Sequence, residues 1–508
     1  MVERPWRTLW HNAAAPHSPE VPVHSLRSLS LSFGSALLAL ALAAPAHSAP
    51  ASPTAPVAKN SSKKLAKTPA KSGSKTASKT TPPKTAAKAA AKASPPTASA
   101  SKPARVVRTA SIASSAAVLG AGASIAASKI NASTSVRDAD AENRLIAIYR
   151  LIGQASNREA MDKARELVRD YPNFQLAQLV YGDLLNSQVR AVRTMGDVSP
   201  LTYKDKASAE VLAELREESQ LRLKALRERP PAGTLPSQFI TLAPSSRHAI
   251  AIDTSRSRLY LFENSITGLH LVADFYISIG KLGAEKNTEG DKRTPLGIYF
   301  ITSNLDPKTL TNFYGSGALP INYPNPLDQS RGKTGSGIWL HGTPPEQFSR
   351  APRASDGCVV LANPDLERLI RTVQVRTTPV VIAQSLQWQP PQTVASGAET
   401  FVATLGRWQQ AKSSGDLSQM LNFYAADFRS QDKTLAQWTP TLRQEMERIQ
   451  GRTITLKDVS YLHWKDAADT MVVTFGEVIE GMRTGSVKRQ YWIRQGPQWK
   501  IFFEGVIG

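Results

Sequence analysis

A long basic segment of low complexity near the start of the chain restricts what this protein can fold into. Residues 50–108 contain 13 Lys and Arg and no acidic residue, in runs of Ala, Lys, Pro, Ser and Thr such as KTPAKSGSKTASKTTPPKTAAKAAAK. A segment with so few apolar side chains cannot bury enough surface to offset the entropy lost on ordering. We therefore predict a disordered tail over residues 49–137, with the folded part of the protein after it.

An apolar run precedes this tail. Residues 29–44 of LSLSFGSALLALALAAPAHSAP are mostly Leu, Ala and Ser, and small residues follow them. This pattern is typical of an export signal with its cleavage site, so we interpret residues 1–48 as a signal peptide and expect a periplasmic or envelope location. The run falls short of the roughly 20 apolar residues that span a bilayer, so we expect no stable transmembrane span. An uncleaved anchor is the alternative.

Residues 50–108 of this tail carry 13 of the chain's net charge of +21. It resembles linker-histone tails, and in a cytoplasmic protein its charge would indicate nucleic-acid binding. After export, we expect it to meet anionic envelope polymers and no nucleic acid. A solvated spacer that only provides reach is the alternative.

The pattern of apolar residues divides the rest of the chain. Residues 138–232 show helical periodicity, and REAMDKARELVRDYPNFQLAQLVYGDLL resembles one tetratricopeptide-type hairpin. Residues 239–385 are rich in short strand patterns such as HAIAID, RLYLFEN, GIYFI and TPVVIA. Residues 386–398 form a predicted linker, and residues 399–508 begin with helices and end with aromatic strands. The expected fold class is multidomain α+β with a mostly β central domain.

Cys358 is the only cysteine in the chain. Exported proteins normally use cysteines in pairs as disulfides, so a lone one is either a buried inert residue or a reactive thiol. A reactive thiol needs a base and groups that stabilise an oxyanion. Of the four histidines after the leader, His341 alone ends a strand pattern (GIWLHGT) and enters a loop containing Gly and Pro. The backbone around Gly357 is a candidate oxyanion hole.

The surroundings of these two residues resemble a known family. HGT at 341–343 and SDGC at 355–358 are similar to the active-site signature of L,D-transpeptidases of the YkuD type, in which a histidine precedes the cysteine by about seventeen residues. The upstream run GKLGAEKNTEGDKRTPLGIYFI and the segment GSGIWLHG also match that family. The resemblance covers about residues 245–385.

The resemblance implies a thioester mechanism on peptidoglycan stem peptides. Cys358 would be the nucleophile, His341 the general base, and the Gly342 carbonyl would orient the imidazole. An amine of a neighbouring stem, or of an envelope protein, would accept the acyl group. No metal site or other cofactor is expected, because the chain lacks HExxH and paired cysteines.

The loop before the cysteine also departs from the family. Asp356 replaces the usual histidine, and its carboxylate is expected to raise the pKa of the thiol unless a cation such as Arg353 offsets it. Ser355, Asp356 and Gly357 form the predicted oxyanion and substrate loop, and Tyr323 and Arg353 are further candidate substrate contacts. Two alternatives remain: a hydrolase of the same bond, and an inactive wall-binding scaffold.

The C-terminal segment resembles the nuclear-transport-factor-like (SnoaL-like) cone fold, with helices first and the ending QYWIRQGPQWKIFFEG. Such a domain would bind glycan or peptide in a pocket, or mediate dimerisation. Five tryptophans fall in this segment, and we expect them to serve as core rather than as ligand platforms: Trp408, Trp438, Trp464, Trp492 and Trp499.

Overall fold

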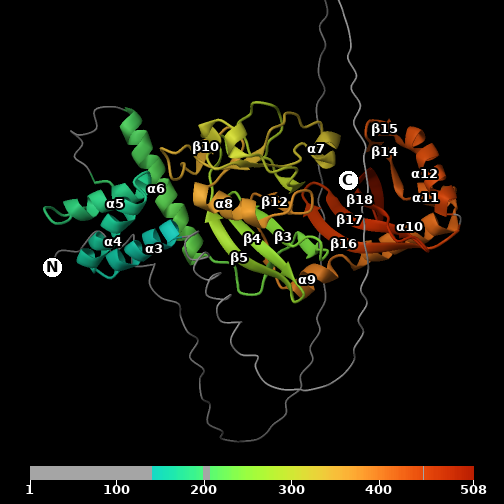
Figure 1. Ribbon diagram of the computed structural model, residues 1–508, viewed down its shortest axis with the longest axis horizontal. Coiled ribbons are helices and arrows are strands. Elements are labelled where there is room, and N and C mark those ends of the chain that lie inside the picture. Colours follow the sequence, from blue (N-terminus) through green and yellow to red (C-terminus); the bar gives the residue numbers. More distant parts are fainter. Residues whose placement is uncertain (1–139, 198–205, 450, 508) are drawn as a thin grey trace, which may run out of the picture. The chain divides into compact units, whose positions relative to one another are not determined.

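The computed structural model describes residues 140–197, 206–449 and 451–507 (Figure 1). The predicted signal peptide (1–48) and basic tail (49–137) lie outside these residues. Within the described part, helices and strands alternate in blocks, and the expected multidomain α+β class is confirmed.

Four helices come first: α3 (Asp140–Gly153), α4 (Asn157–Asp170), α5 (Gln175–Asn186) and α6 (Lys206–Arg227). The predicted hairpin corresponds to α4 and α5, and its apolar face is buried at Ala160, Ala164 and Leu167. A single hairpin buries little surface by itself. Here it shares its core with α3, Leu223 of α6, and Phe348 of the domain that follows.

The central sheet of the next domain has the strand order β5-β4-β3-β12-β7. Its strands are β3 (His248–Asp253), β4 (Arg258–Ser265), β5 (Gly268–Tyr276), β7 (Gly297–Phe300) and β12 (Pro379–Ala383). All neighbours are antiparallel except β3 and β12. The helix α8 (Asn363–Thr372) lies against one face of this sheet (Figure 1) and buries Leu366 and Leu369 in its core.

Smaller sheets hold the loops that carry the predicted site. In one of them β9 (Trp339–His341) lies between β11 (Val359–Val360) and β8 (Ala318–Pro320). In another, β6 (Ile279–Gly280) pairs in parallel with β10 (Arg353–Ser355). Two 3₁₀ turns, η3 (Pro307–Thr309) and η4 (Asn312–Tyr314), and the short helix α7 (Pro326–Ser330) complete this region.

The C-terminal domain has helices α10 (Glu399–Ser414), α11 (Leu417–Leu421) and α12 (Leu435–Ile449). Its sheet has the order β15-β14-β19-β18-β17-β16-β2. The strands from this part of the chain are β14 (Tyr424–Ser430), β15 (Lys433–Thr434), β16 (Ile454–Lys465), β17 (Asp469–Ile479), β18 (Ser486–Gln495) and β19 (Gln498–Val506). Four of the five tryptophans are buried, and Trp438 packs partly buried against them, which confirms their core role.

The junction between the last two domains is more ordered than a linker. Residues 386–398 contain β13 (Trp388–Gln389) and α9 (Pro391–Ser396). The strand β13 pairs with β1 (Leu235–Pro236), and β2 (Phe239–Thr241) pairs with β16 of the C-terminal sheet. These strand pairings were not predicted from the sequence, because they join short segments that are far apart in the chain.

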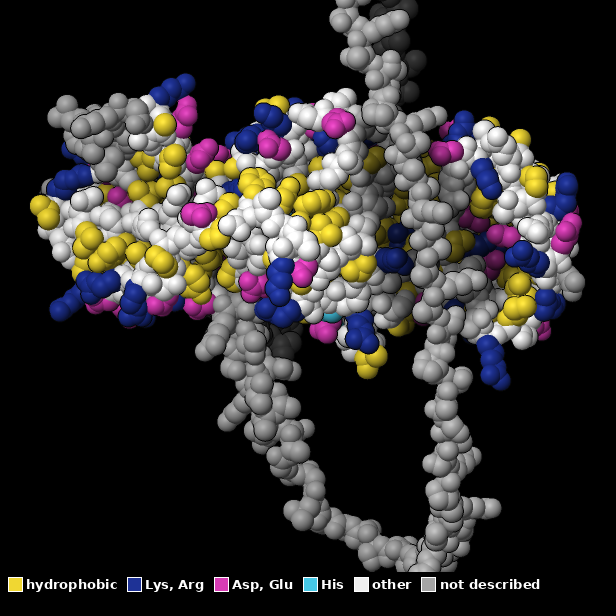
Figure 2. All heavy atoms as spheres, turned by 45° about the horizontal axis from the view of Figure 1, so that its top comes forward, with side chains coloured by type: hydrophobic (Ala, Val, Ile, Leu, Met, Phe, Trp, Pro, Cys, Tyr) yellow, Lys and Arg dark blue, Asp and Glu magenta, His cyan; other side chains and the backbone are white. Residues whose placement is uncertain are grey.

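The described surface mixes charges of both signs. Lys and Arg lie among Asp and Glu across the face in Figure 2, with apolar side chains scattered between them. Across the ranges that the structure describes, none of the helices combines the length and apolarity needed to cross a bilayer.

Candidate active site

Two neighbouring parallel strands bring the predicted nucleophile and base together. In the register of β9 and β11, Val359 pairs with Leu340 and Val360 with His341. Cys358, one residue before β11, therefore stands beside Trp339. Side chains alternate along a strand, so Cys358, Trp339 and His341 project from the same face. Residues seventeen apart in sequence thus become diagonal neighbours.

His341 is held in one tautomer. Its side chain is 1% exposed, and Nδ1 lies 2.7 Å from the carbonyl oxygen of Gly342. Because a carbonyl only accepts hydrogen bonds, Nδ1 carries the proton and Nε2 is left as the acceptor. Burial lowers the pKa of His341 to about 4, with the positive charge of Arg350 acting in the same direction. The imidazole is therefore neutral at pH 7, as a general base must be.

Aromatic rings surround this imidazole. The ring centroid of Tyr314 is 5.1 Å from that of His341, with the rings nearly perpendicular, and the ring of Phe313 is 5.8 Å away. Both aromatic residues come from the 3₁₀ turn η4. Their contacts contribute to the burial of His341, and that burial lowers its pKa.

Cys358 is partly exposed and unpaired. Its Sγ lies 3.6 Å from the carbonyl oxygen of Gly337, within reach of an S–H donor. Burial is the largest cause of a raised thiol pKa, and the Asp356 carboxylate acts in the same direction. The Trp339 amide, Arg350 and Lys286 oppose them. Because the pKa of the thiol is raised and that of the imidazole is lowered, both side chains are neutral at rest.

The turn after His341 depends on Asn363, whose role the sequence analysis missed. Asn363 is the first residue of α8, and its side chain does not cap that helix. Instead, Asn363 Oδ1 accepts from the amides of Ser316 (3.0 Å) and Thr343 (3.2 Å), and Nδ2 donates to the Thr343 carbonyl at 2.9 Å. A Cβ at Gly342 would stand 2.1 Å from Oδ1, so glycine is required there.

The loop SDGC is closed by side-chain bonds. Ser355 Oγ donates to the Cys358 carbonyl at 2.6 Å and accepts from the Gly357 amide at 3.1 Å, while Thr294 Oγ1 donates to the Gly357 carbonyl at 2.9 Å. Gly357 has φ +126°, and a Cβ there would lie 2.8 Å from the Arg293 carbonyl oxygen. The Gly357 amide is thus already engaged and would have to leave Ser355 to bind an oxyanion.

Other predicted site residues lie differently from expectation. Asp356 is exposed and paired with Lys281 at 3.3 Å. Arg353 does not offset it, because its guanidinium binds Glu217 of α6 at 2.8 Å; Arg350 and Lys286 are the cations that act on the thiol. Tyr323 is 5% exposed and donates to the Thr334 carbonyl at 3.1 Å, which is a role in loop packing.

In the part of the chain that the structure describes, no three His, Cys, Asp or Glu side chains gather as metal ligands would.

Comparison with protein families identifies two domains. Residues 247–382 match the family model of the L,D-transpeptidase catalytic domain (YkuD), and residues 400–505 match that of the Cds6 C-terminal NTF2-like domain. Both matches fall within the expected segments 239–385 and 399–508. No curated protein matches the chain significantly.

Several solved structures are similar to this chain. Bd1075 of Bdellovibrio bacteriovorus is 23% identical over 54% of this chain and 98% of its own, with a TM-score of 0.46. The helical cell shape determining protein Pgp2 of Campylobacter jejuni is 23% identical over 53% of this chain and 95% of its own, with a TM-score of 0.43. An L,D-transpeptidase of Mycobacterium smegmatis is 14% identical over 27% of this chain and 59% of its own, with a TM-score of 0.18.

Proposed function

This chain carries a YkuD-type L,D-transpeptidase catalytic domain followed by an NTF2-like domain, and from this premise we propose that it is a cysteine-dependent acyltransferase of peptidoglycan stem peptides. The observation that carries the proposal is the pair formed by Cys358 and His341 on adjacent strands, with His341 Nδ1 bound to the Gly342 carbonyl. That hydrogen bond leaves Nε2 free to take the thiol proton.

The proposed reaction begins as the Cys358 thiol gives its proton to Nε2 of His341 and Sγ attacks the carbonyl carbon between an L- and a D-configured centre. Because the pKa of His341 is about 4, the imidazolium is a strong acid and readily returns the proton to the leaving nitrogen. The C–N bond then breaks, leaving a thioester on Cys358 and a free amine. An amine acceptor, from another stem or an envelope protein, attacks the thioester carbon and gives its proton to Nε2 of His341. The C–S bond breaks, releasing the new amide, and the Cys358 thiolate takes the proton back from His341, which restores the resting pair.

Hydrolysis of the same bond is the second candidate, with water in place of the amine. This candidate rests on the departure at Asp356, an exposed carboxylate two residues before the nucleophile, where the family usually has histidine. Incubation of the purified protein with a disaccharide-tetrapeptide separates the two reactions. Cross-linked dimers indicate transfer, and trimmed fragments alone indicate hydrolysis.

Loss of the nucleophile tests the whole proposal. We expect Cys358→Ala to abolish turnover and His341→Gln to reduce it at least about a hundredfold, the contribution typical of a general base. A carbapenem should form a covalent adduct with the wild type and none with Cys358→Ala, measured as a mass increase of the intact protein. Absence of both turnover and adduct in the wild type would instead support the inactive scaffold.

The domain limits and the location are part of the same proposal. We propose a helical domain at 138–232, a catalytic domain at 239–385 and an NTF2-like domain at 399–508, exported to the envelope by residues 1–48. The basic tail would then contact anionic envelope polymers. Fusion of the leader to a reporter that is active only after export tests the location, and an inactive fusion would contradict it.

A further inference from the structure

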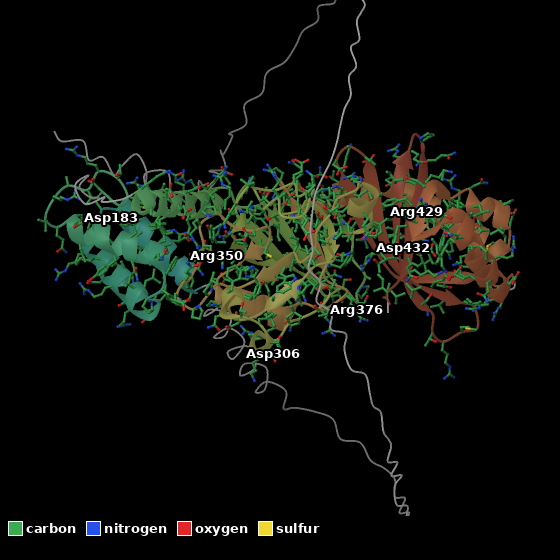
Figure 3. The ribbon with its side chains drawn as sticks, turned by 90° about the horizontal axis from the view of Figure 1, so that it is seen from above. Asp183, Asp306, Arg350, Arg376, Arg429 and Asp432 are labelled. Carbon is green, nitrogen blue, oxygen red and sulfur yellow. The ribbon has the colours of Figure 1, made fainter. Side chains whose placement is uncertain are left out.

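One arginine lies close enough to the proposed catalytic pair for its charge to act on both side chains. Arg350, labelled in Figure 3, lies in the loop between β9 and β10, with its guanidinium carbon 4.4 Å from the ring centroid of Phe313. The ring of Phe313 also lies 5.8 Å from the imidazole of His341 and 5.2 Å from the ring of Tyr314. Among the residues that the structure describes, no side chain forms a hydrogen bond or an ion pair with the Arg350 guanidinium. Asp356, just after β10, raises the pKa of Arg350 through space, but its carboxylate is bound to Lys281 at 3.3 Å.

The backbone around Arg350 is fixed by the helical domain. Phe348 stacks on Phe174 at 4.3 Å and its amide donates to the Asn173 carbonyl at 3.1 Å. Ser349 Oγ donates to Glu218 of α6 at 2.9 Å. Tyr276 donates its hydroxyl to the Arg350 carbonyl at 2.9 Å. The arginine is therefore held in place before any ligand arrives, which lowers the entropy lost on binding.

The positive charge of Arg350 acts on both catalytic groups. One of its two effects favours the proposed proton transfer and the other opposes it. It lowers the pKa of Cys358, which favours the thiolate, and it lowers the pKa of His341, which disfavours the imidazolium that must form with it. Burial lowers the pKa of this half-buried arginine, and the charges of Cys358 and Asp356 oppose that shift only in part. An anion bound to Arg350 would neutralise its charge, and that charge would then no longer oppose protonation of His341.

We propose that Arg350 binds the free carboxylate of the C-terminal residue of the donor peptide, on the leaving-group side of the scissile bond. This inference rests on the proposed function and narrows its substrate. The carboxylate of a terminal residue lies only two bonds beyond the scissile nitrogen, so it must sit close to the nucleophile and base. A planar guanidinium stacked on an aromatic ring matches a carboxylate with two parallel hydrogen bonds. The site thus selects bonds at peptide ends over internal bonds.

A pair of substrates tests this directly. The two substrates are stem tetrapeptides, one with a C-terminal carboxylate and one with a C-terminal amide. Each is assayed with three proteins: the wild type, Arg350→Lys and Arg350→Gln. Arg371→Gln on the exposed face of α8 is the matched control. In the wild type, we expect amidation to lower kcat/KM at least about tenfold, mainly through KM, as for a charged hydrogen bond. With Arg350→Gln, kcat/KM for the acid should fall by a similar factor, to the same value as for the amide. With Arg350→Lys, kcat/KM for the acid should lie between those of the wild type and Arg350→Gln. Arg371→Gln should keep the wild-type preference.

Binding separates this inference from the proposed function. In a Cys358→Ala background, where no chemistry occurs, the peptide acid should bind at least about tenfold more tightly than the amide, and Arg350→Gln should remove the difference. If the wild type turns over neither peptide but this binding difference persists, the reaction is wrong and the carboxylate site stands. Equal kcat/KM for acid and amide with the wild type, or equal binding of the two by Cys358→Ala with Arg350 intact, would overturn the site. The substrate comparison does not require that any variant fold.

Discussion

Burial of a neutral histidine makes the stability of the catalytic domain depend on pH. The pKa of His341 falls from an ordinary 6.5 to about 4. In the unfolded chain this imidazole takes up a proton below pH 6.5, whereas in the folded protein it does so only near pH 4. The unfolded state therefore binds more protons between these values. The contribution of the neutral, buried His341 to the free energy of unfolding is therefore fully present above pH 6.5 and is lost as the pH falls towards 4.

The size of the effect follows from the two pKa values. At 1.36 kcal/mol per pKa unit, the full loss below pH 4 is about 3.4 kcal/mol, of which about 2 kcal/mol has been lost at pH 5. His341→Gln removes this titration. The free energy of unfolding should therefore fall by about 2 kcal/mol more in the wild type than in the variant between pH 8 and pH 5.

Urea titration at both pH values measures this difference, with pulsed hydrogen exchange of peptides from β3 and β12 as a readout of the catalytic domain. Asp183 and Asp365, whose pKa values are raised to about 6 and about 8, also titrate in this range. They are present in both proteins, so their contribution cancels. The same pH dependence in wild type and His341→Gln, or an NMR titration of His341 near pH 6.5, would refute the reasoning.

Three further predictions concern neighbouring parts of the protein. Arg222→Met should destabilise the helical domain by about 3–5 kcal/mol in chemical unfolding, because Arg222 is 3% exposed and its loss leaves the buried Glu218 without a cation; an unchanged midpoint would contradict this. Gly342→Ala should lower kcat/KM and displace the Asn363 amide, since the new Cβ would stand 2.1 Å from Oδ1, and wild-type activity would show that the turn can adapt. Asp356→Asn should increase the rate of iodoacetamide alkylation of Cys358 at pH 7.5, because the Asp356 carboxylate raises the pKa of the thiol; a slower reaction would reverse that assignment.

The helical periodicity of residues 138–232 and the strands of the catalytic domain follow from the sequence because their apolar faces repeat locally. The predicted strands HAIAID and RLYLFEN are β3 and β4. Segments joined only through distant pairing were missed. The strands β2 and β13 are two or three residues long, too short to carry a periodic pattern.

The sequence alone pointed to Cys358 and His341 as the candidate catalytic pair, because one thiol and one well-placed histidine leave few combinations. The tertiary structure decided the burial, the protonation and the charged neighbours of these two side chains. Burial among aromatic rings makes His341 a weak base. The helical domain holds the loop of Arg350 and binds Arg353 through Glu217. Charge and burial act through space, so which arginine reaches the thiol depends on contacts between residues that are more than a hundred positions apart.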